Sequence, residues 1–118
     1  MSDVVGALKV TEEALGKLAD VVLGYDTLPE WVQDKCYFGA MIGRFGNRIA
    51  KGKFTLDGHA YQLPVNNGVN TLHGGGNGFD RQLWKIESVT SGPKASVVLS
   101  LTSPDGDSGY PGEVRSTV

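Results

Sequence analysis

Two short polar segments hold the side chains of this 118-residue chain that are best suited to chemistry. The first, residues 43–49, carries Arg44, Asn47 and Arg48, which together offer many hydrogen-bond donors and one amide that both donates and accepts. This mixture suits the hydroxyl groups of a neutral polyol such as a sugar, whereas a phosphate site would need more lysine and backbone N–H donors. The alternative is a set of solvated surface arginines beside a turn.

The second polar segment, residues 66–78, is built around His73, which is followed directly by three glycines. Histidine is the side chain best suited to proton transfer near neutral pH, and its ring nitrogens also hydrogen-bond hydroxyl groups. The glycines are expected to leave its surroundings open to a ligand. The alternative is a glycine-rich turn with an incidental histidine. The run has neither the G-x-G-x-x-G spacing of a dinucleotide site nor the ending of a P-loop.

The remaining versatile residues are expected to be structural. His59 adjoins an Asp-Gly pair and is predicted to be an exposed turn residue rather than a ligand. Trp84 lies in a strand-like stretch, which favours a place in the core over a platform for a sugar ring. Asp105 and Asp107 stand in a Ser-Pro-Asp-Gly-Asp-Ser-Gly run that is typical of a turn. Two histidines and one cysteine without metal-ligand spacing predict no metal site.

Short β-strands separated by turns are the elements that must position these segments. The Asp-Gly pair at 57–58, flanked by alternating apolar and polar residues, predicts a β-hairpin. Seventeen glycines spread along the chain punctuate it as in an all-β protein. The predicted strands of this region are Lys53–Leu56, Ala60–Leu63, Gln82–Val89, Ser96–Thr102 and Val114–Val118.

Residues 4–25 allow two interpretations. Apolar residues recur there at near-helical spacing, which favours an amphipathic helix. The other interpretation is a strand at Ala7–Val10, a turn, and a strand at Ala19–Tyr25, since a Val-Val-Leu run suits a buried strand. Gly16 would weaken the helix by about 1 kcal/mol. Residues 27–38 are predicted to form a loop or a short helical turn.

Composition and charge exclude several classes of partner. The net charge is −2 and the 11 lysines and arginines form no basic run, so the sequence predicts binding to neither nucleic acid nor anionic membranes. No stretch is apolar enough to span a bilayer. A single cysteine, Cys36, and an N-terminus without a signal-peptide pattern predict a cytoplasmic protein.

In this order, the two polar segments resemble those of the aldose 1-epimerase (galactose mutarotase) family. Gly43–Gly52 is similar to the family's Gly-Arg-x-x-Asn-Arg-Ile-x-x-Gly segment, and Asn70–Gly75 is similar to its Leu-His-Gly-Gly loop. Ser103–Gly112 and Ala19–Asp26 resemble a later turn and an earlier strand of the family. The resemblance favours strand–turn–strand over helix near the N-terminus.

The resemblance implies an all-β fold, the antiparallel β-sandwich of galactose mutarotases. Residues 1–118 would form the N-terminal part of one such domain, truncated at both ends, and so only a partial sandwich. The implied protein is an isomerase of carbohydrate metabolism that interconverts the α and β anomers of hexoses such as glucose and galactose, without a metal or organic cofactor. Carried over residue by residue, the resemblance makes Asn47, Arg48 and His73 substrate-binding residues.

In that family a glutamate removes the proton of the anomeric hydroxyl while a histidine protonates the ring oxygen, each contributing about 10²–10⁴ in rate. Nothing in this chain matches either group, and both are expected beyond Val118. The 118 residues alone are therefore expected to be inactive. The alternatives are a non-catalytic carbohydrate-binding module and a truncated product without function. A partial sandwich would expose strand edges and apolar faces, which predicts self-association.

Overall fold

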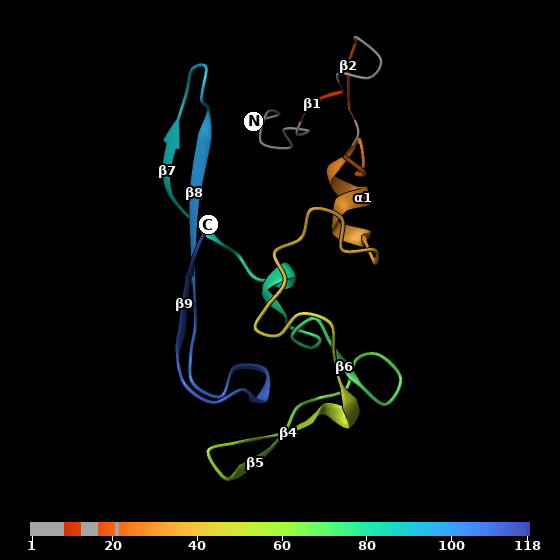
Figure 1. Cartoon of the computed structure of the whole chain (residues 1–118), viewed down its shortest axis with the longest axis vertical. Coiled ribbons are helices and arrows are strands. Elements are labelled where there is room, and N and C mark those ends of the chain that lie inside the picture. The colour runs from red at the N-terminus through yellow and green to blue at the C-terminus, as the bar shows by residue number, and fades with distance from the viewer. Residues whose placement is uncertain (1–8, 13–16, 21) are drawn as a thin grey trace. The chain divides into compact units, whose positions relative to one another are not determined.

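The computed structural model describes residues 9–12, 17–20 and 22–118. The chain divides into two compact units, one ending at Ala40 and the other running from Met41 to Val118. The strands are β1 (Lys9–Glu12), β2 (Lys17–Asp20), β3 (Arg48–Ile49), β4 (Lys53–Leu56), β5 (His59–Gln62), β6 (Thr71–Leu72), β7 (Lys85–Thr90), β8 (Ser96–Ser103) and β9 (Val114–Thr117). The helical segments are α1 (Leu28–Gln33) and the 3-10 turns η1 (Ala50–Gly52), η2 (Phe79–Arg81) and η3 (Asp107–Gly109). All pairings between the described strands are antiparallel, which confirms the predicted all-β class (Figure 1).

In the N-terminal unit, β1 and β2 form an antiparallel hairpin with Lys9 opposite Asp20. The strand–turn–strand prediction is confirmed for the residues that the structure describes. Its second strand is predicted too long, because β2 ends at Asp20 and residues 22–25 belong to no strand. Residues 13–16 of the predicted turn, which spans 12–17, and residues 7–8 of the first predicted strand lie outside the described residues. The two end residues of that turn, Glu12 and Lys17, belong to β1 and β2, so both strands reach further into it than predicted.

Helix α1 confirms the short helical turn predicted within residues 27–38. The Glu30 carboxylate accepts a hydrogen bond from the Thr27 N–H at 3.0 Å, as in a capping box. The Trp31 indole N–H donates to the Tyr25 carbonyl at 2.8 Å, and the two rings meet edge to face with centroids 5.4 Å apart. Tyr25 therefore packs on α1 instead of prolonging β2. Within the described part of the chain, no helix has the length and apolar character needed to cross a bilayer.

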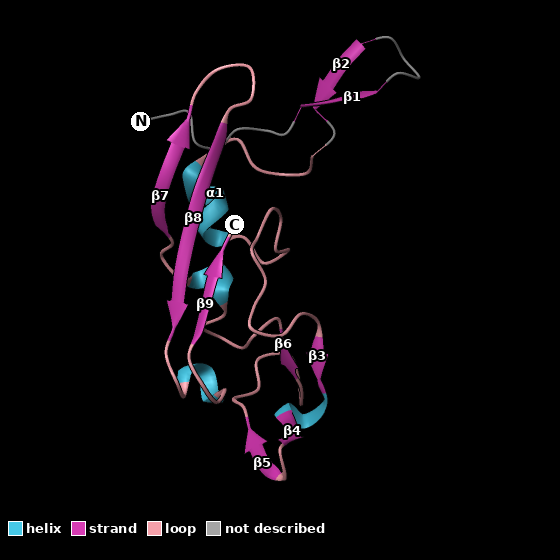
Figure 2. Ribbon diagram, turned by 60° about the vertical axis from the view of Figure 1, so that its left-hand side comes forward, coloured by secondary structure: helices cyan, strands magenta, loops and turns pink. Residues whose placement is uncertain are grey.

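The β4–β5 hairpin turns at Asp57 and Gly58, whose φ angles of 50° and 79° belong to the left-handed region. A two-residue turn of this kind matches the twist of the paired strands. It sets His59 directly opposite Leu56, so β5 begins one residue earlier than predicted. His59 is exposed, as expected, but it opens a strand rather than lying in the turn. Figure 2 shows this hairpin next to the short β3–β6 pair.

Strands β7, β8 and β9 form one antiparallel sheet with β8 in the middle. The sheet begins at Lys85 rather than at the predicted Gln82, because the residues before it complete a turn against η2. The Trp84 indole N–H donates to the Phe79 carbonyl at 3.0 Å, and the two rings pack edge to face with centroids 5.8 Å apart. Trp84 is half-buried by these contacts, in line with its predicted structural place.

The buried apolar side chains that the structure describes all belong to the second unit. They are Leu63, Phe79, Leu101 and Tyr110. They come from four separate parts of the chain, so burying them draws the loops between them together. Strand β7, by contrast, exposes all six of its residues.

Candidate functional site

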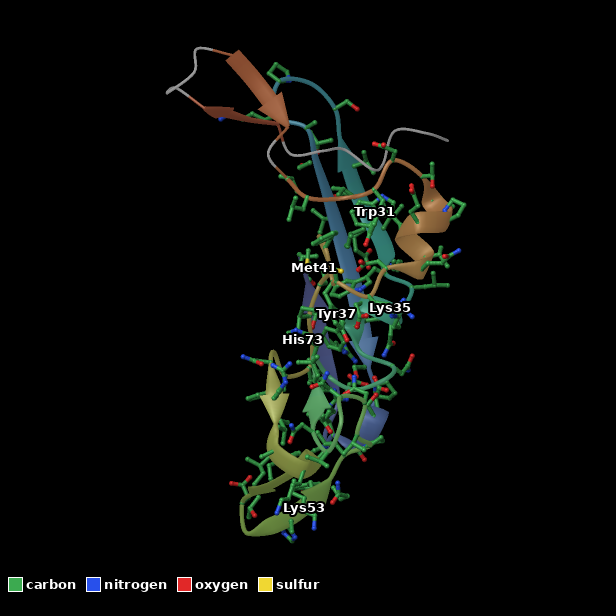
Figure 3. All side chains as sticks on the ribbon, turned by 90° about the vertical axis from the view of Figure 1, so that its right-hand side faces the viewer. Trp31, Lys35, Tyr37, Met41, Lys53 and His73 are labelled. Atoms are coloured by element: carbon green, nitrogen blue, oxygen red, sulfur yellow. The ribbon has the colours of Figure 1, made fainter. Side chains whose placement is uncertain are left out.

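The short β3–β6 pair brings the three predicted site residues side by side. Its register sets Arg48 opposite Leu72, and the hydrogen bonding continues one residue further. The His73 N–H donates to the Asn47 carbonyl at 3.0 Å, and the Asn47 N–H donates to His73 Nδ1 at 3.0 Å. Figure 3 shows His73 at this end of the pair, away from Lys53 on the β4–β5 hairpin. The structure thus places Asn47, Arg48 and His73 in one cluster, and their binding of a sugar stays a prediction.

Arg48 is held by two asparagine side chains. Its Nε donates to Asn67 Oδ1 at 3.0 Å, and its Nη1 donates to Asn47 Oδ1 at 3.2 Å. These bonds orient the guanidinium before a ligand arrives, which reduces the entropy lost on binding. No described residue accepts a hydrogen bond from Arg48 Nη2 or from Asn47 Nδ2. Both groups are exposed, so they can donate to the oxygen atoms of a partner.

The imidazole of His73 has a defined tautomer. Because Nδ1 accepts the hydrogen bond from Asn47, the neutral ring carries its hydrogen on Nε2. His73 and Asn47 both have left-handed backbone conformations, with φ of 53° and 67°. That conformation costs a residue other than glycine about 1–3 kcal/mol and is concentrated at ligand-binding sites. The pair of reciprocal hydrogen bonds offsets part of this cost.

Other asparagines of the second polar segment build the loop itself. The Asn66 side chain accepts a hydrogen bond from the Leu72 N–H at 2.7 Å and donates to the Leu72 carbonyl at 2.9 Å, in place of a neighbouring strand. Asn70 Oδ1 accepts a hydrogen bond from the Lys51 N–H at 3.1 Å. Residue spacing alone indicates no individual role for these asparagines. The one sequence feature that points to this role is the number of asparagines within residues 66–77, since asparagine side chains readily replace backbone hydrogen-bond partners in loops.

Glycines bring the two polar segments into backbone contact. A Cβ on Gly74 would lie 1.7 Å from the Gly43 carbonyl oxygen, and a Cβ on Gly43 would lie 2.2 Å from the Phe79 ring. The Gly43 carbonyl also accepts a hydrogen bond from the Phe79 N–H at 3.2 Å. The expectation that the glycines after His73 leave space for a ligand is therefore wrong for Gly74, which is buried against the first segment.

Arg44 is not part of the cluster, although the sequence groups it with the donors of a polyol site. Its Nε donates to Ser103 Oγ at 2.9 Å. Its Nη1 donates to the carbonyls of Pro111 and Gly112, at 3.0 and 2.7 Å. Its Nη2 donates to the carbonyls of Ser103 and Pro104, at 3.0 and 2.5 Å. Arg44 thus binds the 103–112 turn to the first polar segment.

Tyr110 lies under this arginine. The Arg44 guanidinium carbon is 5.9 Å from the centre of its ring, a cation–π distance. Burial raises the pKa of the Tyr110 phenol, and the charge of Arg44 only partly opposes that effect. The phenol hydroxyl is buried and has no hydrogen-bond partner among the described residues.

Asp105 and Asp107 belong to the predicted turn, but Asp107 does more than shape it. Burial raises the pKa of its carboxyl, yet hydrogen bonds from Ser103 and Gln82 and the charge of Arg44 outweigh burial, so the pKa lies below its usual value. Asp107 is therefore an ionised, half-buried acceptor. Local sequence patterns do not indicate this role, because Gln82 is 25 residues away along the chain.

The open hollow of the β4–β5 hairpin is not part of the cluster. An open hollow of about 450 Å³ lies on the β4–β5 hairpin, beside the stacked rings of Phe54 and Tyr61, and none of the three site residues lines it. Within the residues that the structure describes, no three side chains of His, Cys, Asp or Glu gather closely enough to hold a metal ion. The chemistry available at the cluster is hydrogen bonding to oxygen atoms by an oriented guanidinium, an amide and an imidazole.

Proteins of known sequence resemble this chain over most of its length. Residues 5–118 match the family model described as aldose 1-epimerase. The chain is 51% identical over 109 residues to galactose mutarotase from Bos taurus, which covers 92% of this chain and 30% of that protein. It is 42% identical over 104 residues to aldose 1-epimerase from Escherichia coli (strain K12), which covers 87% of this chain and 29% of that protein.

Solved structures agree with the sequence relatives. The crystal structure of an aldose epimerase homologue from C. elegans matches with a TM-score of 0.77 and 38% identity over 88% of this chain and 31% of that one. The crystal structure of galactose 1-epimerase from Lactobacillus acidophilus matches with a TM-score of 0.69 and 29% identity. The match covers 85% of this chain and 29% of that one. The predicted partial antiparallel β-sandwich is thereby confirmed. The chain spans about 30% of the length of the curated relatives it matches, and it belongs to the aldose 1-epimerase family.

Proposed function

We propose that this chain supplies Asn47, Arg48 and His73 to the sugar site of an aldose 1-epimerase that interconverts the α and β anomers of hexoses such as galactose and glucose. The observation that carries the proposal is the reciprocal hydrogen bonding of Asn47 and His73. Arg48, the residue after Asn47, lies beside them in β3. Three neutral or cationic donors from two segments meet there, and hydroxyl oxygens are the acceptors they suit.

Each residue has a distinct role in this proposal. The Arg48 guanidinium donates to sugar hydroxyl oxygens in an orientation set by Asn67 and Asn47. The Asn47 amide donates through Nδ2. The His73 imidazole hydrogen-bonds an oxygen of the sugar and supports charge that develops on the ring oxygen during ring opening.

Titration of the labelled chain with D-galactose, followed by NMR, tests the binding proposal. A hydrogen bond from a charged group contributes about 1.5–3 kcal/mol, so Arg48→Ala should weaken binding about 10–100-fold. Arg115→Ala is the matched control, because Arg115 is exposed and pairs with Glu113 at 2.8 Å, outside the cluster. Equal losses in both variants, or no binding at millimolar galactose, would contradict the proposal.

The isolated chain is expected to bind without catalysing, because no residue in it matches the family's acid histidine or base glutamate. Polarimetry of freshly dissolved α-D-glucose should show no acceleration above the buffer rate. A protein-dependent rate that His73→Ala abolishes would overturn this expectation. Binding without turnover would equally suit a non-catalytic carbohydrate-binding module, whereas a chain lacking both binding and a cooperative melt would match a truncated product without function.

Self-association through the β7–β9 sheet is a second proposal for the isolated chain. Strand β7 lies at an edge of the sheet, and Ile86 and Val89 are 58% and 67% exposed. Such an edge pairs readily with another chain. Light scattering should show that Val89→Lys lowers the apparent mass, whereas Val69→Lys, at an equally exposed site outside the sheet, should not.

A cytoplasmic location, supported by the single cysteine, is testable by cell fractionation.

A further inference from the structure

A continuous hydrogen-bond network lies beneath the loops that carry the site. Ser103 is fully buried, and its hydroxyl accepts a hydrogen bond from Arg44 Nε at 2.9 Å while donating to Asp107 Oδ2. Gln82 Nε2 donates to the same Asp107 oxygen at 3.1 Å. Gln82 Nε2 also donates to the Asn77 carbonyl at 3.2 Å. The network therefore runs without a break from Arg44 to Asn77.

The two ends of this network lie in the two polar segments. Arg44 precedes Asn47 and Arg48 in the first, and Asn77 follows His73 in the second. The hydrogen bond from the Asn47 N–H to the His73 side chain is exposed to water, which competes for it. The hydrogen bonds to the ionised Asp107 are partly buried, and bonds of that kind are stronger and hold a tighter geometry, although the Gln82–Asn77 bond is exposed.

We propose that Ser103 and Asp107 are positioning residues for the sugar site, because they fix the separation of the Arg48 loop and the His73 loop. The sugar part of this inference rests on the proposed function. Without the negative charge of Asp107, the hydrogen bonds from Gln82 and Ser103 lose their charge assistance. The second segment is then held to the 103–112 turn less tightly, with the long hydrogen bond from Ser108 Oγ to the Asn77 carbonyl at 3.5 Å still in place. Arg44 keeps its four backbone acceptors, so the first segment stays in place. The two loops then shift relative to each other, within the limits set by the β3–β6 pair and the Gly43–Gly74 contact.

The variant Asp107→Asn tests the proposal in the whole chain, with Asp105→Asn as its matched control. Asp105 lies in the same turn and accepts a hydrogen bond from the Gly112 N–H, but it is exposed and lies outside the network. The readouts are the NMR signals of the His73 ring nitrogens and the Asn47 amide, together with the affinity for D-galactose. Asp107→Asn should shift these signals and weaken galactose binding about 2–30-fold, whereas Asp105→Asn should change neither.

A general loss of folding must be separated from a local shift. The ring signals of Phe54 and Tyr61, which stack 5.1 Å apart on the β4–β5 hairpin, should stay unchanged in the Asp107 variant. In addition, the affinity losses of Asp107→Asn and Arg48→Ala should be less than additive, since both act on one site. If Asp107→Asn does not fold, Gln82→Ala interrupts the same network at a half-buried position.

Unchanged His73 and Asn47 signals in both Asp107→Asn and Gln82→Ala would overturn the proposal. Fully additive affinity losses would do the same, because they would show that the network acts independently of Arg48. If the unaltered chain does not bind galactose while the two signals still shift in the variants, the proposed function fails and the positioning of the loops by Asp107 stands.

Discussion

The substitution Gly74→Ala probes the contact between the two polar segments most directly. Gly74 has a φ of +90°, and a Cβ there would lie 1.7 Å from the Gly43 carbonyl oxygen and 2.9 Å from the Arg44 nitrogen. A left-handed conformation costs alanine about 1–2 kcal/mol, and forcing extra atoms into a packed site costs about 1–3 kcal/mol. Since backbone atoms cannot swing aside as a flexible side chain does, the combined cost should be about 2–5 kcal/mol.

Urea unfolding monitored by tryptophan fluorescence measures this cost. With a slope of about 1–3 kcal/mol per molar urea, the midpoint should fall by roughly 0.7 M or more without a change in slope. Gly76→Ala is the control, because Gly76 is exposed and its Cβ would meet no atom within 4 Å. That variant should stay within about 0.5 kcal/mol of the parent chain. Equal midpoints for the two variants would refute the close contact between the segments.

Three further outcomes are expected. The hydrogen bond that Tyr25 donates to Asp34 raises the pKa of the phenol to about 12. The contribution of this bond to stability is therefore present below about pH 10 and lost as pH rises toward 12. In Asp34→Asn, ultraviolet titration should show the pKa of the Tyr25 phenol nearer its usual value. The lowered pKa of Asp107 means that its contribution is present above the usual carboxyl pKa and lost as pH falls through the lowered value, so acid unfolding of Asp107→Asn should lack that component. Leu63 is 1% exposed and Leu83 is 98% exposed; Leu63→Ala should cost about 2–5 kcal/mol in urea unfolding, and Leu83→Ala less than about 0.5 kcal/mol.

Local patterns predicted the elements whose cause is local. The Asp57-Gly58 pair produces the β4–β5 hairpin because two successive left-handed residues close a two-residue turn. The start of β7 was predicted too early, because the residues before it pack on η2 through Trp84. β-Propensity does not register a contact of that kind.

For the candidate site too, the sequence predicted what depends on residue type and missed what depends on distant contacts. The residue types of Asn47, Arg48 and His73 pointed to hydrogen bonding with a polyol, and the structure brings them together. Arg44 has the same donor chemistry, yet its acceptors lie 59 to 68 residues further along the chain. No spacing rule distinguishes an arginine that faces a ligand from one that binds a distant turn. Asp107 was missed for the same reason.

The acceptors of Arg44 have a practical meaning for protein engineering. Four of its five hydrogen bonds end on main-chain oxygen atoms, which every amino acid carries. The side chains at Pro104 and Pro111 contribute nothing to that attachment beyond the backbone path they favour. Randomised libraries or a grafted recognition loop at these two positions can therefore diversify the surface while Arg44 keeps its hydrogen bonds to the backbone.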